Sequence, residues 1–187
     1  MATALEVFAE RGYDGTTMGE IARRVGMTQP GLLHHFTTKD ELLLEVVAER
    51  SAEQKQSFDS IIATRGDIIG PLLEEMAEEN LATRVHQQLF TTLSAEAIRP
   101  DHPAHDVFVA RYRRLAKVLE ASLLASKHPK DDAPYLAREI LATVDGIHQQ
   151  WLLDPRRVDL RKALRVYGCR LETMVGPKAQ RGRTRSK

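Results

Sequence analysis

The sequence predicts an all-α protein, with a small helix-turn-helix domain followed by a larger helical domain. Apolar residues recur three and four positions apart along almost the whole chain, which is the spacing of amphipathic helices. No segment alternates apolar and polar residues long enough to favour a strand. Prolines at 100, 103, 129 and 155 interrupt the pattern at points where a helix cannot continue. We therefore expect about nine helices and no sheet.

The first four helices are marked by caps. A helix from about Thr3 to Arg11 ends at Gly12, because glycine accepts the left-handed conformation of a helix end. Threonine hydroxyls can cap the starts of the next three, and two of these have glutamate at capping-box spacing. Their expected ranges are 17–26, 28–36 and from 38 onward, the last continuing as a long connecting helix. Later helices are expected at about 67–80, 82–99, 104–126, 132–153 and 158–175.

The segment from Thr17 to Phe36 has the pattern of a helix-turn-helix. Ala22 is small where the second helix would cross the first, and Gly26 lies in the turn, where a positive φ costs little for glycine. The expected buried residues are Ile21, Val25, Leu32 and Phe36. On spacing alone a plain helical hairpin explains the pattern equally well. If the segment binds DNA, residues 28–35 enter the major groove.

The residues around this segment carry a family resemblance. Residues 8–17 read FAERGYDGTT, residues 21–27 read IARRVGM and residues 34–42 read HHFTTKDEL. Together these runs resemble the DNA-binding domain of the TetR family of transcriptional repressors. The resemblance implies a homodimer that binds a palindromic operator and releases it when a small-molecule effector enters the C-terminal domain.

The resemblance also implies which residues contact operator DNA. Thr17 and Lys39 would bind phosphate, and the second helix of the pair would present residues to base edges and the groove. The full implied set is Thr17, Thr28, Gln29, Pro30, Gly31, Leu33, His34, His35 and Lys39. Gln29 suits an adenine edge, since its amide both donates and accepts, whereas Pro30 and Leu33 offer only apolar contact.

Two features depart from the family pattern. Many relatives carry tyrosine where this chain has Leu33, so a phosphate-directed hydroxyl is missing. Relatives also have a basic arm before the first helix, whereas only Met1 to Ala4 precede Leu5 here. We expect either a shortened first helix or a start inside a longer natural protein.

The charge balance is close to neutral, with 27 Lys and Arg against 26 Asp and Glu. Five of the basic residues lie in the last dozen positions, so 22 basic residues face 26 acidic ones in the rest of the chain. Within residues 1–39, four basic and four acidic residues cancel. We therefore expect few phosphate contacts per subunit and a shallow salt dependence of DNA binding. The basic tail is expected to be a disordered, solvated terminus, with auxiliary phosphate binding as the alternative.

The C-terminal helices predict a dimer interface and a ligand cavity. Apolar stripes on the last two helices suit near-parallel packing, and in the resembled family these helices pair between subunits. The predicted interface residues are Leu136, Ile140, Val144, Gly146, Ile147, Trp151, Leu160, Leu164, Tyr167, Leu171 and Met174. Alternatively, both stripes face their own core.

The middle helices would surround the cavity, which suits an apolar or aromatic effector. Its candidate lining residues are Leu73, Met76, His86, Leu89, Phe90, Leu93, Phe108, Tyr112, Leu119, His148 and Trp151. A stripe of this kind is more often simply core, and for His86 and His148 we favour structural roles. We therefore divide the chain into a DNA-binding domain at 1–45, a ligand-binding and dimerisation domain at 46–176, and the tail at 177–187.

Other sites have little support in the sequence. Cys169 is the single cysteine, so no intrachain disulfide or thiolate metal site can form, and we expect it to be a small buried hydrophobe. His102 and His105 could share a metal, but we favour a solvated pair. No nucleophile–base arrangement or phosphate loop is present, so we expect no enzyme, no cofactor and no metal. Without an apolar membrane span or a signal peptide, we expect a cytoplasmic protein.

The sequence is also compatible with two classes of protein other than a DNA-binding repressor. One is a helical protein that binds or sequesters a small molecule and has lost its affinity for DNA. The other is a small enzyme built in a helical bundle, which would need a metal or cofactor. A sequence-selective DNA complex excludes the first, and metal-free, colourless protein excludes most versions of the second.

Overall fold

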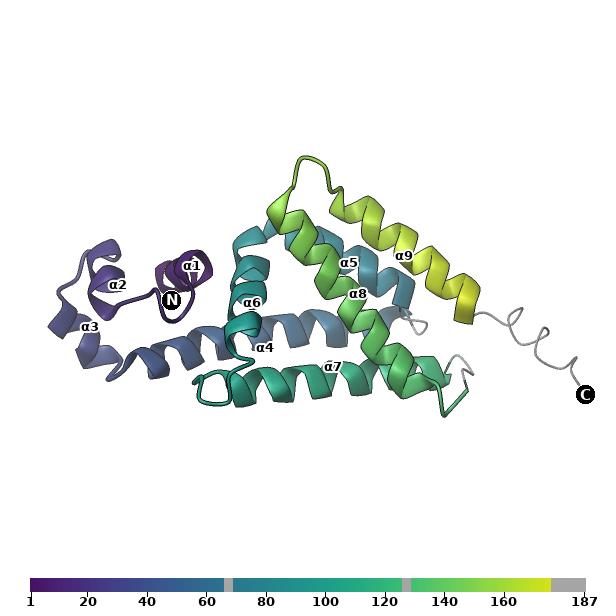
Figure 1. The fold of residues 1–187 in the computed structure, drawn as a ribbon, viewed down its shortest axis with the longest axis horizontal. Coiled ribbons are helices and arrows are strands. Elements are labelled where there is room, and N and C mark those ends of the chain that lie inside the picture. Colours follow the sequence, from purple (N-terminus) through teal and green to yellow (C-terminus); the bar gives the residue numbers. More distant parts are fainter. Residues whose placement is uncertain (66–68, 126–128, 176–187) are drawn as a thin grey trace, which may run out of the picture. The chain divides into compact units, whose positions relative to one another are not determined.

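The computed structural model describes the backbone of residues 1–65, 69–125 and 129–175. It describes the side chains in those ranges except residues 57–65, 69, 71, 174 and 175. All regular structure in the described ranges is α-helical, and the nine helices confirm the predicted class (Figure 1). The helices are α1 (Ala2–Arg11), α2 (Met18–Arg24), α3 (Gln29–His35), α4 (Lys39–Arg65), α5 (Ile69–Ala82), α6 (Arg84–Glu96), α7 (His105–Ala125), α8 (Ala133–Leu153) and α9 (Leu160–Val175).

The predicted caps determine where the short N-terminal helices begin. Thr17 accepts a hydrogen bond from the backbone N–H of Glu20 at 3.2 Å, and Thr28 accepts one from Gly31 at 3.2 Å. Each satisfies one of the N–H groups that a helix start leaves without a partner. Gly12 and Gly26 both have positive φ, at 69° and 71°, as their places after α1 and α2 require.

The chain divides into two compact units, and α4 and α7 each contribute to both. Unit 1 contains residues Met1–Gln56 and Thr83–Ala110. Unit 2 contains residues Ser57–Ala82 and the chain from Arg111 onward. The contact-based division therefore assigns α6 to the same unit as the helix-turn-helix, whereas the division predicted from the sequence separates residues 1–45 from all that follows.

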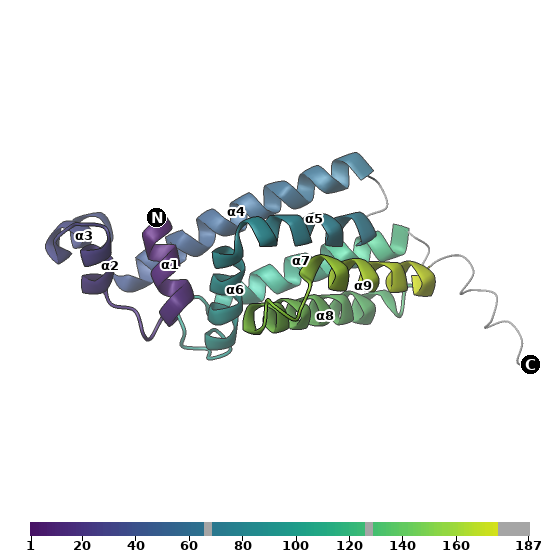
Figure 2. The same cartoon turned by 90° about the horizontal axis from the view of Figure 1, so that it is seen from above.

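The core of unit 1 is built by α1, α2, the first turns of α4 and α6 (Figure 2). Phe8 and Leu43 are fully buried, and burial of side chains this large stabilises a fold by about 1.5–3 kcal/mol each. The apolar faces of α1 and α4 are buried in this core, at Leu5, Phe8, Ala9, Leu42, Leu43, Val46 and Val47. This core holds α2 and α3 at one end of α4 (Figure 1).

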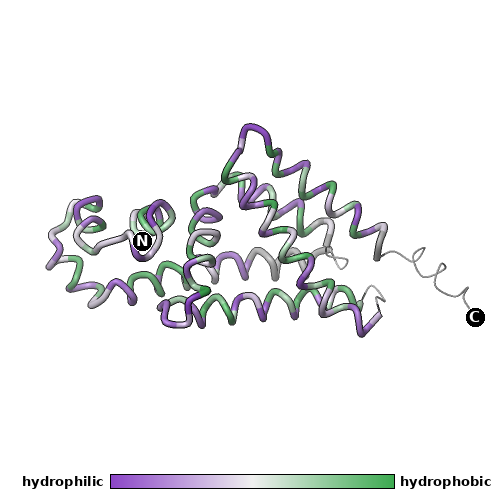
Figure 3. The backbone as a smooth tube through the Cα atoms, viewed as in Figure 1, coloured by the Kyte–Doolittle hydropathy of each residue, from purple (hydrophilic) through white to green (hydrophobic). Residues whose placement is uncertain are grey.

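The core of unit 2 forms where α5 packs along α9 and α8 packs against α9. Leu73, Ile140 and Leu164 are almost completely buried there. Hydrophobic and hydrophilic residues alternate along these helices, so each keeps a polar face outside the core (Figure 3). Within the described ranges, no helix has both the length and the apolar character needed to cross a bilayer.

Two residues predicted to be buried in the helix-turn-helix are more exposed than expected. Val25 was expected to be buried between α2 and α3, but it is 39% exposed, because it follows the last residue of α2 and no longer lies on the buried face of that helix. Phe36 is only partly buried for a similar reason, since it follows the last residue of α3. The basic tail at 177–187 lies outside the described residues.

Candidate functional site

The short helix α3 exposes almost all of its side chains. Leu32 is its one buried residue and attaches it to the rest of unit 1. Most of the residues predicted to contact DNA are exposed on α3 or at its start. They are Thr28, Gln29, Pro30, Leu33, His34 and His35, whereas Gly31 is partly buried. Leu33 is 38% exposed. The helix thus presents a surface of the size and kind that enters a DNA groove.

Gln29 lies against Gly19 of α2. A Cβ atom at residue 19 would approach the side-chain oxygen of Gln29 to 3.1 Å, closer than most such contacts. The missing side chain at Gly19 therefore leaves room for the Gln29 amide beside α2. Sequence reasoning identified Gln29 but missed Gly19, although a glycine inside a seven-residue helix is itself a signal of close approach.

Lys39, the first residue of α4, bonds to the turn between α1 and α2. Its ammonium group donates hydrogen bonds to the backbone oxygens of Tyr13, at 2.9 Å, and Thr16, at 3.0 Å. It also lies 3.9 Å from the centre of the Tyr13 ring, within the range of a cation–π interaction. Two of its three N–H groups are therefore used inside the protein, which leaves the third for another acceptor. Thr17 is exposed, and its hydroxyl accepts from the N–H of Glu20, so that bond does not use the hydroxyl hydrogen. The phosphate contacts of Lys39 and Thr17 stay predictions.

Tyr13 joins the turn after α1 to the start of α4. Its hydroxyl donates a short hydrogen bond to the carboxylate of Asp40, and burial together with this carboxylate raises the pKa of Tyr13 to about 12. The phenol therefore keeps its proton at any physiological pH. The role of Tyr13 was not predicted, although the residue lies within the run that carries the family resemblance.

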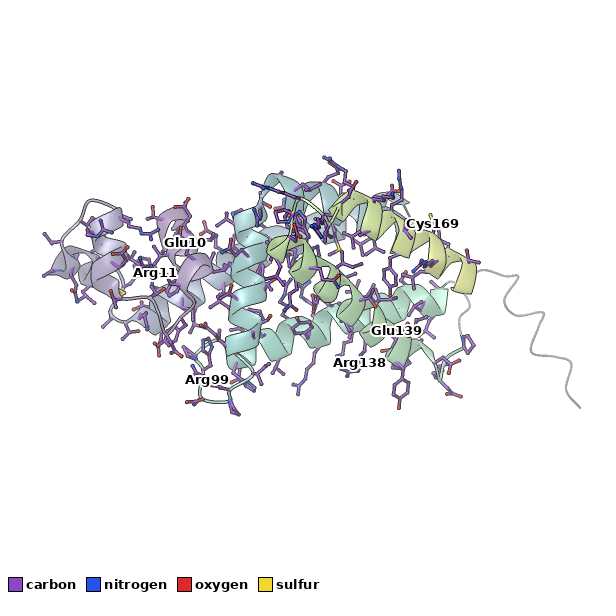
Figure 4. All side chains as sticks on the ribbon, turned by 45° about the horizontal axis from the view of Figure 1, so that its top comes forward. Glu10, Arg11, Arg99, Arg138, Glu139 and Cys169 are labelled. Carbon is purple, nitrogen blue, oxygen red and sulfur yellow. The ribbon has the colours of Figure 1, made fainter. Side chains whose placement is uncertain are left out.

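The arginines of the helix-turn-helix are paired with acidic side chains. Arg24 bonds Glu20 at 2.9 Å and Glu10 of α1 at 2.8 Å, and Arg23 also bonds Glu20. Hydrogen bonds from Arg24 hold the pKa values of Glu10 and Glu20 below their usual range, so both carboxylates stay ionised. Figure 4 shows Glu10 and Arg11 at the end of α1, and Arg11 lies 3.7 Å from Glu20. The expectation of few phosphate contacts stays a prediction.

Helix α6 packs on α1 through a series of polar contacts to backbone atoms. Glu96 accepts a hydrogen bond from the N–H of Tyr13 at 2.8 Å, and Gln88 donates one to the carbonyl of Ala9 at 3.1 Å. Just beyond α6, Arg99 pairs with Asp14 at 2.8 Å (Figure 4). These contacts connect α6 directly to the turn that leads into the helix-turn-helix. They could not be predicted from the sequence, because contacts between residues about 80 positions apart leave no local pattern.

The predicted cavity residues are divided between the two units. Unit 1 contains His86, Leu89, Phe90, Leu93 and Phe108, and the rings of Phe90 and Phe108 meet edge to face at 6.2 Å. Unit 2 contains Leu73, Met76, Tyr112, Leu119, His148 and Trp151. Most of them are buried, and Leu73, Leu119 and Trp151 belong to the core of unit 2. Their role in a cavity stays a prediction.

His148 and Tyr112 have protein partners in unit 2. His148 is 1% exposed and shares a hydrogen bond of 2.8 Å with the side-chain nitrogen of Asn80. Because that nitrogen donates, the Nε2 atom of His148 accepts and is unprotonated. Burial lowers the pKa of His148 to about 4, so the ring is neutral at pH 7. Tyr112 donates a hydrogen bond of 2.7 Å to Asp145.

The stripes predicted to form a dimer interface face the core of their own unit. Leu136, Ile140, Val144, Trp151, Leu160, Leu164 and Leu171 are buried in it, and Ile147 and Tyr167 pack against it. Ile147 and Tyr167 remain partly exposed, and the role of these residues in a dimer interface stays a prediction. Gly146 differs, because a Cβ atom added to it would meet nothing within 4 Å. The side chain of Met174 lies outside the described residues.

Two further side chains differ from expectation. His102 is 3% exposed rather than solvated, because the loop between α6 and α7 folds it against the Tyr13 ring at 5.0 Å. Cys169 is exposed on α9 rather than buried (Figure 4). The apolar stripe of α9 passes through residues 164, 167 and 171, which leaves Cys169 on the opposite side. Among the described residues, no three His, Cys, Asp or Glu side chains are placed to hold a metal ion.

The exposed α3, capped by Thr28 and anchored by Leu32, defines a DNA-binding helix-turn-helix protein. Residues 1–46 match the family model described as bacterial regulatory proteins of the tetR family. Residues 71–176, more than half of the chain, match the model of the C-terminal domain of BetI-type transcriptional repressors. The chain belongs to the TetR family of bacterial transcriptional regulators, which are not enzymes.

Relatives and solved structures agree with this assignment. The chain is 25% identical over 176 residues to the transcriptional regulator AcrR of Shigella flexneri, covering 88% of this chain and 81% of the relative. It is 27% identical over 166 residues to PksA of Bacillus subtilis, covering 86% and 80%. Its fold is similar to a transcriptional regulator from Rhodococcus, with a TM-score of 0.76, 21% identity, and coverage of 92% and 93%. It is also similar to a protein from Saccharomonospora viridis solved in complex with choline, with a TM-score of 0.71, 22% identity and 92% of each chain covered.

Proposed function

We propose that this regulator is a repressor that binds a palindromic operator as a homodimer and releases it when a small-molecule effector binds. The observation that carries the proposal is the exposure of α3, whose capped start presents Gln29 and Pro30 while Leu32 alone is buried. Two such helices, related by a two-fold axis and about one or more turns of DNA apart, would read the two halves of a palindrome.

The contacts of α6 with α1 support a route by which an effector acts on DNA binding. Glu96 and Gln88 bond backbone atoms on both sides of the end of α1, so a shift of α6 moves the turn that leads to α2. The effector then favours a state in which α3 no longer fits the groove. Because the two sites are linked, operator binding weakens effector binding by the same factor.

The small-molecule part of the proposal is supported by the C-terminal match and by one solved relative. Residues 71–176 match the C-terminal model of BetI-type repressors, and the similar protein from Saccharomonospora viridis was solved in complex with choline. The apolar residues in the predicted cavity, such as Leu89 and Phe90, suit an apolar or aromatic body of the effector.

Footprinting on DNA from around the protein's own gene tests the proposal. We expect a protected site with two symmetric halves and a complex that contains two chains, measured by light scattering. Removing salt should strengthen the complex, since phosphate contacts release counterions. Equal affinity for this DNA and for random DNA would contradict operator binding, and one chain per site would contradict the dimer.

A further inference from the structure

Unit 1 contains a group of polar side chains on α4 and at the start of α6. On α4 the group lies just beyond the buried apolar residues of that helix. Positions 43, 47 and 50 of α4 are spaced four and three apart, so Arg50 continues the stripe that begins with Leu43 and Val47. The side chain of Arg50 is only 11% exposed. Ser51 follows it on α4, and His86 lies in the first turn of α6.

Two polar atoms of this group are buried without a hydrogen-bond partner. They are the hydroxyl oxygen of Ser51 and the Nδ1 atom of His86. A buried polar atom left in this condition costs about 1–3 kcal/mol. Since the great majority of buried polar groups in proteins are satisfied, two such atoms make this group a candidate place for a water or for a ligand with polar atoms.

The electrostatics of the group favour an anion. Burial and the nearby Arg50 cation both lower the pKa of His86. Arg50 is paired with Glu53, whose side chain is 53% exposed, so this carboxylate lies toward solvent. An anionic oxygen next to Arg50 and His86 would offset the cost of placing these two basic side chains together.

We propose that Arg50, Ser51 and His86 bind an anionic oxygen group, a carboxylate or a phosphate, of an effector with an apolar body. This inference rests on the proposed function, since it describes the effector of that function. The guanidinium and imidazole N–H groups and the serine hydroxyl would donate to the anionic oxygens, as charge-assisted hydrogen bonds. The apolar body would lie toward the buried α6 residues Leu89 and Phe90.

Matched pairs of charged and neutral probes test the proposal on the full chain, without DNA. The pairs are octanoate with octanamide, phenylacetate with phenylacetamide, and octyl phosphate with octanol. Binding is followed by the thermal unfolding midpoint, which a ligand of the folded state raises. We expect the charged member of at least one pair to raise the midpoint by several degrees and its neutral member to raise it less. The carboxylate and phosphate pairs distinguish the two kinds of anion.

Variants assign the charge preference to the cluster. Arg50→Gln removes the cation and should reduce the affinity for the charged probe tenfold or more. Ser51→Ala is the second variant, used in case Arg50→Gln does not fold. It should reduce the affinity for the charged probe several-fold. Lys55→Gln, at an exposed position one turn further along α4, is the matched control and should bind like the unmodified chain.

Two results would overturn the proposal. One is that no pair shows a preference for the charged probe, as expected if the group binds only water. The other is that Arg50→Gln and Ser51→Ala both still bind the charged probe more tightly than its neutral partner, by as much as the unmodified chain does. Because the assay contains no DNA, either result leaves operator binding untouched, and a chain that fails to bind its operator can still show the preference.

Discussion

The carboxylate of Glu96, at the end of α6, accepts a 2.8 Å hydrogen bond from the backbone N–H of Tyr13, 83 positions earlier in the chain. The adjacent Gly12 leaves room for it, since a Cβ atom there would lie 2.0 Å from a Glu96 oxygen. The closeness of these two residues depends on a glycine with a positive φ that ends α1. The contact fixes α6 to the turn before the helix-turn-helix.

Replacing Glu96 with alanine should destabilise the protein by about 1–3 kcal/mol, because a backbone N–H loses a charged acceptor. The measurement is the free energy of unfolding in urea. Glu6→Ala provides the control, since Glu6 is exposed on α1, and should change it by less than about 0.5 kcal/mol. Equal effects of the two substitutions would show that the Glu96 contact does not hold unit 1 together.

Gly19→Ala should separate stability from DNA selectivity. Alanine favours a helix over glycine by about 0.5–1 kcal/mol, so the free energy of unfolding should not fall. The added methyl group meets Gln29 at 3.1 Å and displaces its amide, so the preference for operator over random DNA should fall several-fold. In a Gln29→Ala background the same change should have no further effect on selectivity. A full effect in that background would contradict the role given to Gly19.

Lys39→Met should make DNA binding less sensitive to salt. If each subunit uses the remaining Lys39 N–H on one phosphate, the slope of log affinity against log salt falls in magnitude by about 2 for a dimer. The same substitution removes two hydrogen bonds to backbone oxygens, so stability should also fall by about 1–3 kcal/mol. Lys55→Met is the control for both readouts. An unchanged slope with lowered stability would leave Lys39 as a purely structural residue.

Much of unit 1 could be predicted from local sequence, because its signals are local. Thr17, Thr28 and Gly26 act within a few residues of themselves, and the structure places their caps and positive φ as predicted. The prediction that Val25 is buried was wrong for a physical reason. Val25 follows the last residue of a short helix, so the helical spacing that places Ile21 on the buried face no longer applies to it.

The rest depends on contacts between distant residues. The Glu96–Tyr13 bond, the burial of His102 and the Arg50–His86 group join segments that no local period relates. Arg50 nevertheless gave a signal, since a cation at a stripe position of α4 is unusual. The stripes of α8 and α9 were correctly recognised as apolar, but periodicity cannot distinguish a core from a subunit interface, and these side chains pack in their own core.

Gly146→Ala should test whether that part of α8 lies at the proposed dimer interface. Within one chain the position is open, so alanine should stabilise the helix by about 0.5–1 kcal/mol. At a close helix–helix contact between subunits, the methyl group should weaken association about tenfold, as measured by sedimentation equilibrium. Unchanged association would place the interface elsewhere.

Acid should destabilise the protein through His148. The pKa of its buried ring is about 4, below the usual value of 6.5, so the unfolded chain binds a proton at a pH where the folded chain does not. Stability from this group is therefore complete above pH 6.5 and falls as the pH drops toward 4, by about 3 kcal/mol in total. His148→Gln can still accept from Asn80 and should remove that part of the loss. An identical pH profile for the two proteins would contradict a neutral, buried His148.

If α3 reads DNA sequence, Gln29→Ala should change the affinity for operator DNA and the affinity for random DNA by different amounts. Fluorescence anisotropy at one fixed salt concentration gives both affinities. We predict that the substitution weakens operator binding by about 1–3 kcal/mol per subunit and leaves random-DNA binding almost unchanged, because a side chain that contacts base edges adds affinity only for the matching sequence. An equal loss on both DNAs, or no loss on either, would show that Gln29 does not read DNA sequence.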